Sequence, residues 1–176
     1  TFLGQLDGTE LEIRLGDWVV ERALKQIGRW NEAGMAQVVS VNISPTHLLV
    51  PDFAERIEQA LSRHPQVAPE QLELEIVENA TLSNLEEASL LLASCRSLGV
   101  RVSLDDFGTG YSSLAYLRRL PVDLLKIDQS FVRDMLDDPN DLGIVESVVR
   151  LARAFNRPVI AEGVETMEHG AMLLRL

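Results

Sequence analysis

Carboxylate side chains and one amide recur along the chain at the ends of short apolar runs. Carboxylate and amide oxygens are the ligands that Mg²⁺ and Mn²⁺ prefer, whereas zinc and copper favour softer donors. The pattern therefore predicts a site for hard divalent cations, provided that the fold brings these residues together. The candidates are Asn42, Glu75, Asp105, Asp106 and Glu162, with the cation Lys126 among them.

The Asp105-Asp106 pair is the sharpest local feature. Adjacent carboxylates at the end of a strand could bind two cations and share one oxygen ligand between them. Without a cation, the two charges would raise each other's pKa by repulsion. The alternative is a helix cap or a turn, which Gly108 and Gly110 just downstream also favour. The pair alone does not decide between a metal site and a turn.

Glu75 and Lys126 each interrupt an apolar run. The alternation of residues 72–76 turns Glu73 and Glu75 to the same face of a strand. A carboxylate inside a barrel is unfavourable unless it is paired or bound to a metal. Lys126 could form a salt bridge with Asp105 or Asp128, or it could orient water and stabilise phosphoryl charge. Spacing leaves both interpretations of Lys126 open.

Hydrophobic periodicity predicts strands that alternate with helices. The predicted helices span residues 16–33, 52–63, 84–99 and 141–155. The predicted strands span residues 38–42, 72–76, 101–105, 124–127 and 158–161. We expect the first strand to be buried on both faces, because its run is short, apolar and β-branched. The alternation predicts right-handed crossovers and a mainly parallel sheet, either open or closed into a barrel.

The polar residues favour a (β/α) barrel over an open sheet. They stand at or just past the carboxyl ends of five successive predicted strands, and these ends converge on one mouth in a barrel. An open sheet would spread them along an edge. A complete barrel of eight strands usually needs about 250 residues. We therefore expect an incomplete α/β barrel here, with further segments at both ends.

Composition limits the partners of the chain. Its 176 residues suit one domain, and 16 Lys plus Arg against 27 Asp plus Glu give a net charge of −11. Such a surface repels DNA and anionic membranes, so a phosphate ligand would need a metal or a local positive charge. No apolar run approaches membrane-spanning length. Cys95 is expected to be a buried small hydrophobe, and His47, His64 and His169, which lack metal-ligand spacing, are expected at the surface.

Five motifs together resemble a known family. They are Val-Asn-Ile-Ser at 41–44, Leu-Glu-Ile-Val-Glu at 74–78, Asp-Asp-Phe-Gly-Thr-Gly-Tyr-Ser-Ser-Leu at 105–114, Leu-Lys-Ile-Asp at 125–128 and Ala-Glu-Gly-Val-Glu at 161–165. In this order they resemble the motifs of the EAL-domain cyclic di-GMP phosphodiesterases. The resemblance implies a modified TIM-type barrel with one antiparallel strand. It also implies hydrolysis of cyclic di-GMP to linear pGpG with two Mg²⁺ or Mn²⁺ ions.

The resemblance also implies a ligand set. Asn42, Glu75 and Asp105 would bind one metal ion. Asp105 would be shared with a second ion, which Asp106 would bind and Glu162 would complete directly or through water. Asp105 and Glu162 thereby become catalytic residues, and Asn42 is also placed against the substrate.

Further roles follow from the same resemblance. Lys126 would be catalytic, holding the attacking water or neutralising the phosphate, and Asp128 would contact the substrate. Glu78 and Glu165 would fix the active-site loop at residues 107–114. The family pattern also implicates this loop in dimer contacts and in the transmission of regulation to the metals.

The resemblance implies that residues 1–176 form a partial EAL phosphodiesterase domain. The Glu-Ala-Leu segment that names the family is expected upstream of Thr1, and a glutamine-containing strand is expected after Leu176. Expected partners are cyclic di-GMP, a second copy in a homodimer, and sensor or diguanylate cyclase domains elsewhere in a cytoplasmic or membrane-anchored protein. The alternatives are a catalytically inactive cyclic di-GMP receptor and a dimerisation module.

Overall fold

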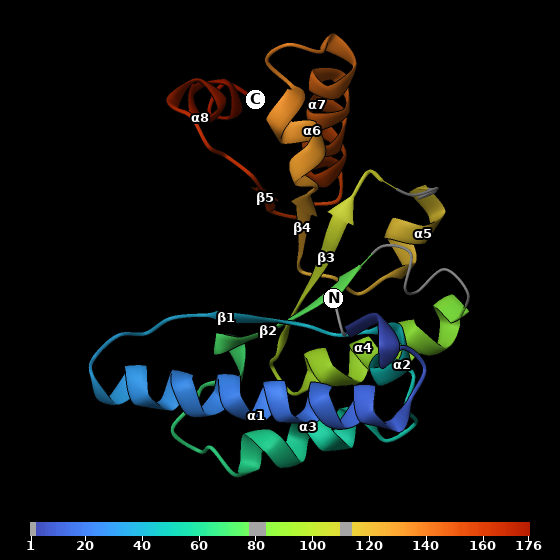
Figure 1. Cartoon of the computed structure of the whole chain (residues 1–176), viewed down its shortest axis with the longest axis vertical. Coiled ribbons are helices and arrows are strands. Elements are labelled where there is room, and N and C mark those ends of the chain that lie inside the picture. The colour runs from blue at the N-terminus through green and yellow to red at the C-terminus, as the bar shows by residue number, and fades with distance from the viewer. Residues whose placement is uncertain (1–2, 78–83, 110–113) are drawn as a thin grey trace.

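The computed structural model describes residues 3–77, 84–109 and 114–176, and its centre is a parallel sheet. The strands are β1 (Val39–Asn42), β2 (Leu72–Val77), β3 (Arg101–Phe107), β4 (Leu124–Ile127) and β5 (Val159–Ala161). They pair in chain order, and every pairing is parallel. The sheet turns strongly between β1, which runs across the view, and β4, which stands upright (Figure 1).

Helices gather at the two ends of this sheet (Figure 1). Near β1 and β2 lie α1 (Glu10–Glu32), α3 (Phe53–Ser62) and α4 (Leu85–Ser97). Near β4 and β5 lie α6 (Gln129–Asp134), α7 (Pro139–Ala154) and α8 (Met167–Leu173). The shorter elements are α2 (Pro45–Leu48), α5 (Leu114–Arg119) and the 3₁₀ turns Leu3–Gln5 and Pro69–Gln71. None of the helices within the described residues is long and apolar enough to cross a membrane.

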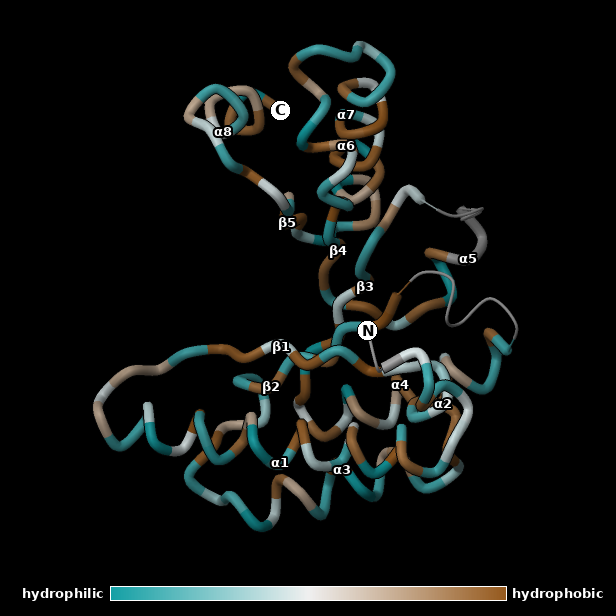
Figure 2. Tube along the Cα trace, in the orientation of Figure 1, coloured by the Kyte–Doolittle hydropathy of each residue, from teal (hydrophilic) through white to brown (hydrophobic). Residues whose placement is uncertain are grey.

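The two faces of the sheet have opposite chemistry, because side chains alternate along a strand. On the face toward the helices, Leu74, Ile76, Leu104 and Leu125 are fully buried. They form one core with helix residues that include Leu24, Phe53, Leu92 and Val145. The hydrophobic and hydrophilic residues mix along both strands and helices (Figure 2). The other face carries Glu73, Glu75, Ser103, Asp105 and Lys126.

The predicted strands are confirmed to within two residues, but β1 is not buried on both faces. Val41 is buried, whereas Ser40 and Asn42 are exposed. Asn42 and Ser40 belong to the polar face, where β1 has only β2 beside it among the described strands. The β-branched residues of β1 therefore indicate a strand with one buried face and not two.

Helix α1 begins at Glu10, six residues before the predicted start at Gly16. A glycine lowers helix propensity, which made Gly16 resemble a boundary. The structure shows why a glycine is needed at this position, because a Cβ at Gly16 would lie 2.2 Å from Nδ1 of His47. Gly16 therefore makes room for an imidazole inside a continuous helix.

The expectation of surface histidines is wrong for two of the three. His47 and His169 are buried. Nε2 of His47 donates to Oδ1 of Asp17 at 2.9 Å, and Nε2 of His169 donates to the carbonyl of Arg133 at 3.1 Å. Both rings have polar partners inside the fold, so polar sequence context did not indicate exposure. Cys95 is buried, as predicted.

The five strands do not close into a barrel, yet the polar residues at their carboxyl ends still meet. Lys126 on β4 forms ion pairs with Glu75 on β2, Asp105 on β3 and Glu162 just past β5. The expectation of an incomplete barrel whose strand ends converge is therefore confirmed. The curvature of these five strands is enough to bring the groups together.

Candidate active site

Lys126 is the centre of a cluster of charged side chains on the polar face. Its Nζ lies 2.7 Å from Oε1 of Glu75 and 3.4 Å from Oδ1 of Asp105, and it also pairs with Oε1 of Glu162. The exposed fractions of the side chains are 10% for Lys126, 8% for Glu75, 13% for Asp105 and 32% for Glu162. Three of the four groups are therefore well removed from water, and Coulomb interactions among them are only partly screened.

Strand register brings these groups to one face of the sheet, near the carboxyl ends of the strands. Glu75 lies opposite Asn42 on one neighbouring strand and opposite Ser103 on the other. Asp105 follows Ser103 by two residues, so it projects from the same face. Lys126 lies opposite Ile160, two residues before Glu162. The side chains therefore converge because each strand places its polar residue near its carboxyl end.

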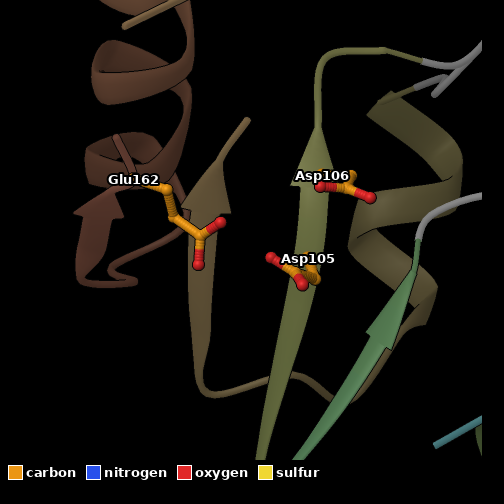
Figure 3. A group of neighbouring side chains, drawn as sticks. All are labelled: Asp105, Asp106 and Glu162. Atoms are coloured by element: carbon orange, nitrogen blue, oxygen red, sulfur yellow. The ribbon is translucent and has the colours of Figure 1, made fainter. Parts of the chain in front are cut away.

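A distortion in β3 brings the second aspartate to the cluster. The pairing between β3 and β4 shifts between Leu104 and Phe107, and Asp106 adopts a left-handed backbone with a φ of 53°. Successive side chains on a regular strand point to opposite faces, and a bulge changes that direction. Asp105, Asp106 and Glu162 each offer an oxygen within 4.8 Å of the others (Figure 3). Asp105-Asp106 is therefore part of a bulged strand and not a helix cap.

Glu162 depends on a tight turn after β5. Its backbone nitrogen donates to the carbonyl of Ile127 at 3.2 Å, which extends the pairing of β4 with β5. The next residue, Gly163, has a φ of +70°, and a Cβ there would lie 2.8 Å from Cβ of Gln129. Gly163 thus permits both the left-handed turn and the close approach of α6.

Asp128 joins the cluster from the start of α6. Its side chain accepts a hydrogen bond at 2.8 Å from the backbone nitrogen of Ser130, and it also interacts with the Ser130 hydroxyl. Burial raises the pKa of Asp128, but these bonds outweigh it and hold that pKa below its ordinary value. Burial, a hydrogen bond with Asp128 and repulsion from Asp105 together raise the pKa of Asp106 to about 6.

The donor set fits hard divalent ions. Three carboxylates surround one ammonium group at Lys126, and Asp106 adds a further acidic group beside Asp105. Within the described residues, Oδ1 of Asp105 is buried and has no hydrogen-bond partner. A buried carboxylate oxygen without a donor is unfavourable, and a cation would satisfy it. Asp105, Asp106 and Glu162 are the residues best placed to hold such an ion.

The other predicted site residues either have no side-chain hydrogen bond or ion pair with the cluster around Lys126 within the described part of the chain, or lie outside that part. Asn42 is exposed and lies opposite Glu75 across the β1–β2 pairing. Glu165 is exposed, and it raises the pKa of Arg133 by charge attraction after the larger effect of Asp134. Glu78 and residues 110–113 of the expected active-site loop lie outside the described residues. The structure brings Glu75, Asp105, Asp106, Lys126, Asp128 and Glu162 together.

Sequence reasoning missed three supporting residues. Ser130 binds Asp128, and the Asp-x-Ser spacing at a helix start is a signal that could have found it. Glu73, which the sequence placed on the same face as Glu75 without assigning it a role, is buried and accepts a hydrogen bond from Ser40 at 2.9 Å. Ser103 is buried two residues before Asp105 and has no hydrogen-bond partner among the described residues.

Comparison with known proteins matches this arrangement to one family. The family model described as the EAL domain matches residues 1–176. The chain belongs to the EAL domain family. Its EAL sequence is 37% identical over 176 residues to the bifunctional diguanylate cyclase/cyclic di-GMP phosphodiesterase MucR of Pseudomonas aeruginosa, covering 99% of this chain and 26% of MucR.

A second relative is the cyclic di-GMP phosphodiesterase NbdA of the same organism, 39% identical over 173 residues, which are 98% of this chain and 22% of NbdA. Among solved structures, the MucR phosphodiesterase in complex with c-di-GMP superimposes on this EAL chain with a TM-score of 0.93 at 36% identity. That match covers 99% of this chain and 70% of the solved one. The chain thus spans about a quarter of the length of these two curated relatives. The modified (β/α) barrel predicted from the motifs is the fold of this family, and five of its parallel strands are present here.

Proposed function

We propose that this chain is the part of a cyclic di-GMP phosphodiesterase domain that carries most of its active site. The proposed reaction is hydrolysis of cyclic di-GMP to linear pGpG. The observation that supports it best is the meeting of Glu75, Asp105 and Lys126 from three strands with Glu162 from the turn after a fourth. Two relatives that carry this activity in their names are 37% and 39% identical to the chain over the segments that match it.

Two Mg²⁺ or Mn²⁺ ions are the proposed cofactors. Asn42, Glu75 and Asp105 would hold one ion, and Asp105, Asp106 and Glu162 would hold the other, with every donor an oxygen. When bound, such ions supply an activated water and stabilise negative charge on the phosphate. The chain's own acidic surface, with a net charge of −11, would otherwise repel a dianionic substrate.

The residues of the chain orient the reacting groups. The Lys126 ammonium can donate hydrogen bonds to the attacking water or to a phosphate oxygen. Water adds to phosphorus, the bond from phosphorus to the 3′ oxygen breaks, and the leaving oxygen takes a proton, as formation of pGpG requires. Asp128 and Asn42 would contact the substrate beside this centre, and Glu78 and Glu165 would fix the loop at residues 107–114.

The proposal also covers the domains and the second copy that would accompany this chain. Most of MucR lies outside the part that this chain matches, and its name includes a diguanylate cyclase. We propose that a sensor or cyclase domain accompanies this chain, that it works in the cytoplasm, and that it acts as a homodimer. DNA is not a partner that its charge would attract.

The test is turnover of cyclic di-GMP by the purified full-length domain with Mg²⁺ or Mn²⁺. We expect pGpG as the product, and we expect Glu75→Gln and Asp105→Asn to lower the rate by at least about a thousandfold, because each removes a metal-holding charge. Circular dichroism and the thermal midpoint would check that both variants fold. Arg150→Gln, which removes an exposed i,i+4 ion pair on α7, should leave the rate unchanged. Binding of cyclic di-GMP without turnover would overturn the enzyme in favour of the receptor.

A further inference from the structure

Lys126 is bound in the structure by the same carboxylates that would hold the metal ions. Its ammonium pairs with Glu75 on β2, Asp105 on β3 and Glu162 just past β5. An ammonium group has three donors, of which two are used in hydrogen bonds to Glu162 and Glu75, whereas Asp105 is held by charge attraction alone. While these pairs persist, two of the three donors of Lys126 are bound to carboxylates and cannot face a substrate.

The charges of this cluster do not balance. Three carboxylates, of which Glu75 and Asp105 are well buried and Glu162 is partly exposed, surround one ammonium, which leaves two negative charges. Asp106 and Asp128 lie beside them. Oδ1 of Asp105 remains without a hydrogen bond although Nζ of Lys126 is 3.4 Å away. One ammonium therefore holds the strands together but satisfies the carboxylates only in part.

From this geometry we infer that Lys126 is a stand-in cation that holds the metal-free site together and is released from Glu75 and Glu162 when divalent ions bind. The inference rests on the proposed two-metal function. A divalent ion repels an ammonium group a few ångströms away and competes for the same oxygens. Release of Lys126 would then free its donors for the attacking water or the phosphate, so that metal loading prepares the lysine for catalysis.

The first test compares Lys126→Met with the wild type in EDTA and in saturating Mg²⁺. Removing Lys126 leaves three carboxylates without a counter-charge, so the thermal midpoint in EDTA should fall by roughly 5 to 10 °C. In Mg²⁺ the ions replace the missing charge, and the fall should shrink to about 2 °C or less. The variant should also bind Mg²⁺ about tenfold more tightly, because a competing charge is gone.

Two variants serve as controls. Lys126→Arg keeps the positive charge, so it should retain most of the midpoint in EDTA. Arg96→Met removes the cation of the half-exposed pair between Arg96 and Asp123, which lies at the amino end of β4 and includes none of the carboxylates around Lys126. Its midpoint should fall equally with and without Mg²⁺. An equal fall for Lys126→Met under both conditions would show a purely structural role and would overturn the inference.

The second test needs no variant. The sequence contains two lysines, and Lys25 is exposed on α1, so it is an internal reference for Lys126. Acylation by an amine-specific ester, followed by mass spectrometry, should modify Lys25 equally in EDTA and in Mg²⁺. Modification of Lys126 should rise several-fold in Mg²⁺, at matched ionic strength, because it has left its carboxylate partners. An unchanged or lower modification of Lys126 would contradict the release.

Turnover separates this inference from the proposed function. Hydrolysis of cyclic di-GMP by a wild type whose Lys126 shows no metal-dependent release would overturn the stand-in role alone. Metal-dependent release in a protein that never hydrolyses cyclic di-GMP would overturn the proposed function alone.

Discussion

Asp106 shows how a single backbone angle changes the chemistry of a strand. Its left-handed φ of 53° at the irregularity in β3 places its carboxylate within reach of Asp105 and Glu162. Non-glycine residues seldom adopt this conformation, and those that do are often held there at functional sites. The result is a carboxyl group whose pKa is raised to about 6 by burial, by its hydrogen bond with Asp128 and by neighbouring charges.

The raised pKa of Asp106 predicts a pH-dependent destabilisation of the metal-free protein. The folded state holds a proton on Asp106 that the unfolded chain releases at lower pH, so stability falls as pH rises toward about 6 and stays lowered above it. Asp106→Asn cannot ionise. In EDTA it should therefore raise the thermal midpoint relative to wild type at pH 7.5 and have little effect at pH 4.

Asp137→Asn, at an exposed position before α7, is the matched control for this measurement and should show no such pH dependence. A lower midpoint for Asp106→Asn than for wild type at pH 7.5 would contradict the assigned cause. The same variant should bind Mg²⁺ more weakly, because a carboxylate ligand becomes an amide.

The roles of the charged residues were partly visible in the sequence. The apolar run around Lys126 indicated burial, and an ion pair with Asp105 was one of the two alternatives considered. The pairs with Glu75 and Glu162 were not predictable, because they depend on how far the sheet curves. The direction of Asp106 was not predictable either, since it follows from a pairing irregularity that no residue type specifies.

At the scale of elements, the turn after β5 positions Glu162. Gly163 has a φ of +70°, and a Cβ there would lie 2.8 Å from Gln129. Gly163→Ala should therefore lower the free energy of unfolding by about 1 to 3 kcal/mol, through strain and contact with α6. Displacement of Glu162 should also weaken Mg²⁺ binding in a calorimetric titration.

Gly170→Ala is the matched control for the turn. Gly170 lies within α8, and an added Cβ there has nothing within 4 Å. Alanine favours a helix over glycine by up to about 1 kcal/mol, so this variant should be neutral or slightly stabilised. A Gly163→Ala protein as stable as wild type, with unchanged Mg²⁺ binding, would show that the turn does not position Glu162.

Element types and order were predictable where burial dominates. The runs that became β2, β3 and β4 are leucine, isoleucine and valine on the face toward the helices, so hydrophobicity alone identified them. Errors arose where a local contact overrides composition, as at Gly16 beneath the His47 ring. The same contact explains why a buried histidine was assigned to the surface.

At the scale of the whole molecule, acidic side chains are spread along the chain and are also concentrated around Lys126. The net charge of −11 is spread over the chain, and the cluster around Lys126 adds a concentrated negative region. Repulsion between like charges destabilises a compact protein, and salt screens it over about 10 Å at 0.1 M. These charges should therefore make stability depend on ionic strength.

Sodium chloride should raise the thermal midpoint of the metal-free protein by a few degrees between about 0.02 and 0.5 M, since screening relieves the repulsion. Differential scanning fluorimetry in EDTA at pH 7.5 measures this directly. The rise should be smaller in saturating Mg²⁺, because bound divalent ions have already neutralised the cluster. A midpoint that falls with added salt would show that attractive ion pairs outweigh the net charge.

The residues that would hold the metal ions differ in how firmly the sheet fixes their backbone. Glu75 and Asp105 belong to β2 and β3, each of which has a strand on both sides, so displacing either would disrupt the middle of the sheet. Glu162 follows β5, a strand of three residues that is joined in the described fold to β4. Because Glu162 lies in the turn after β5 and not within a strand, a movement of that turn would shift its carboxylate while β2 and β3 keep their pairing.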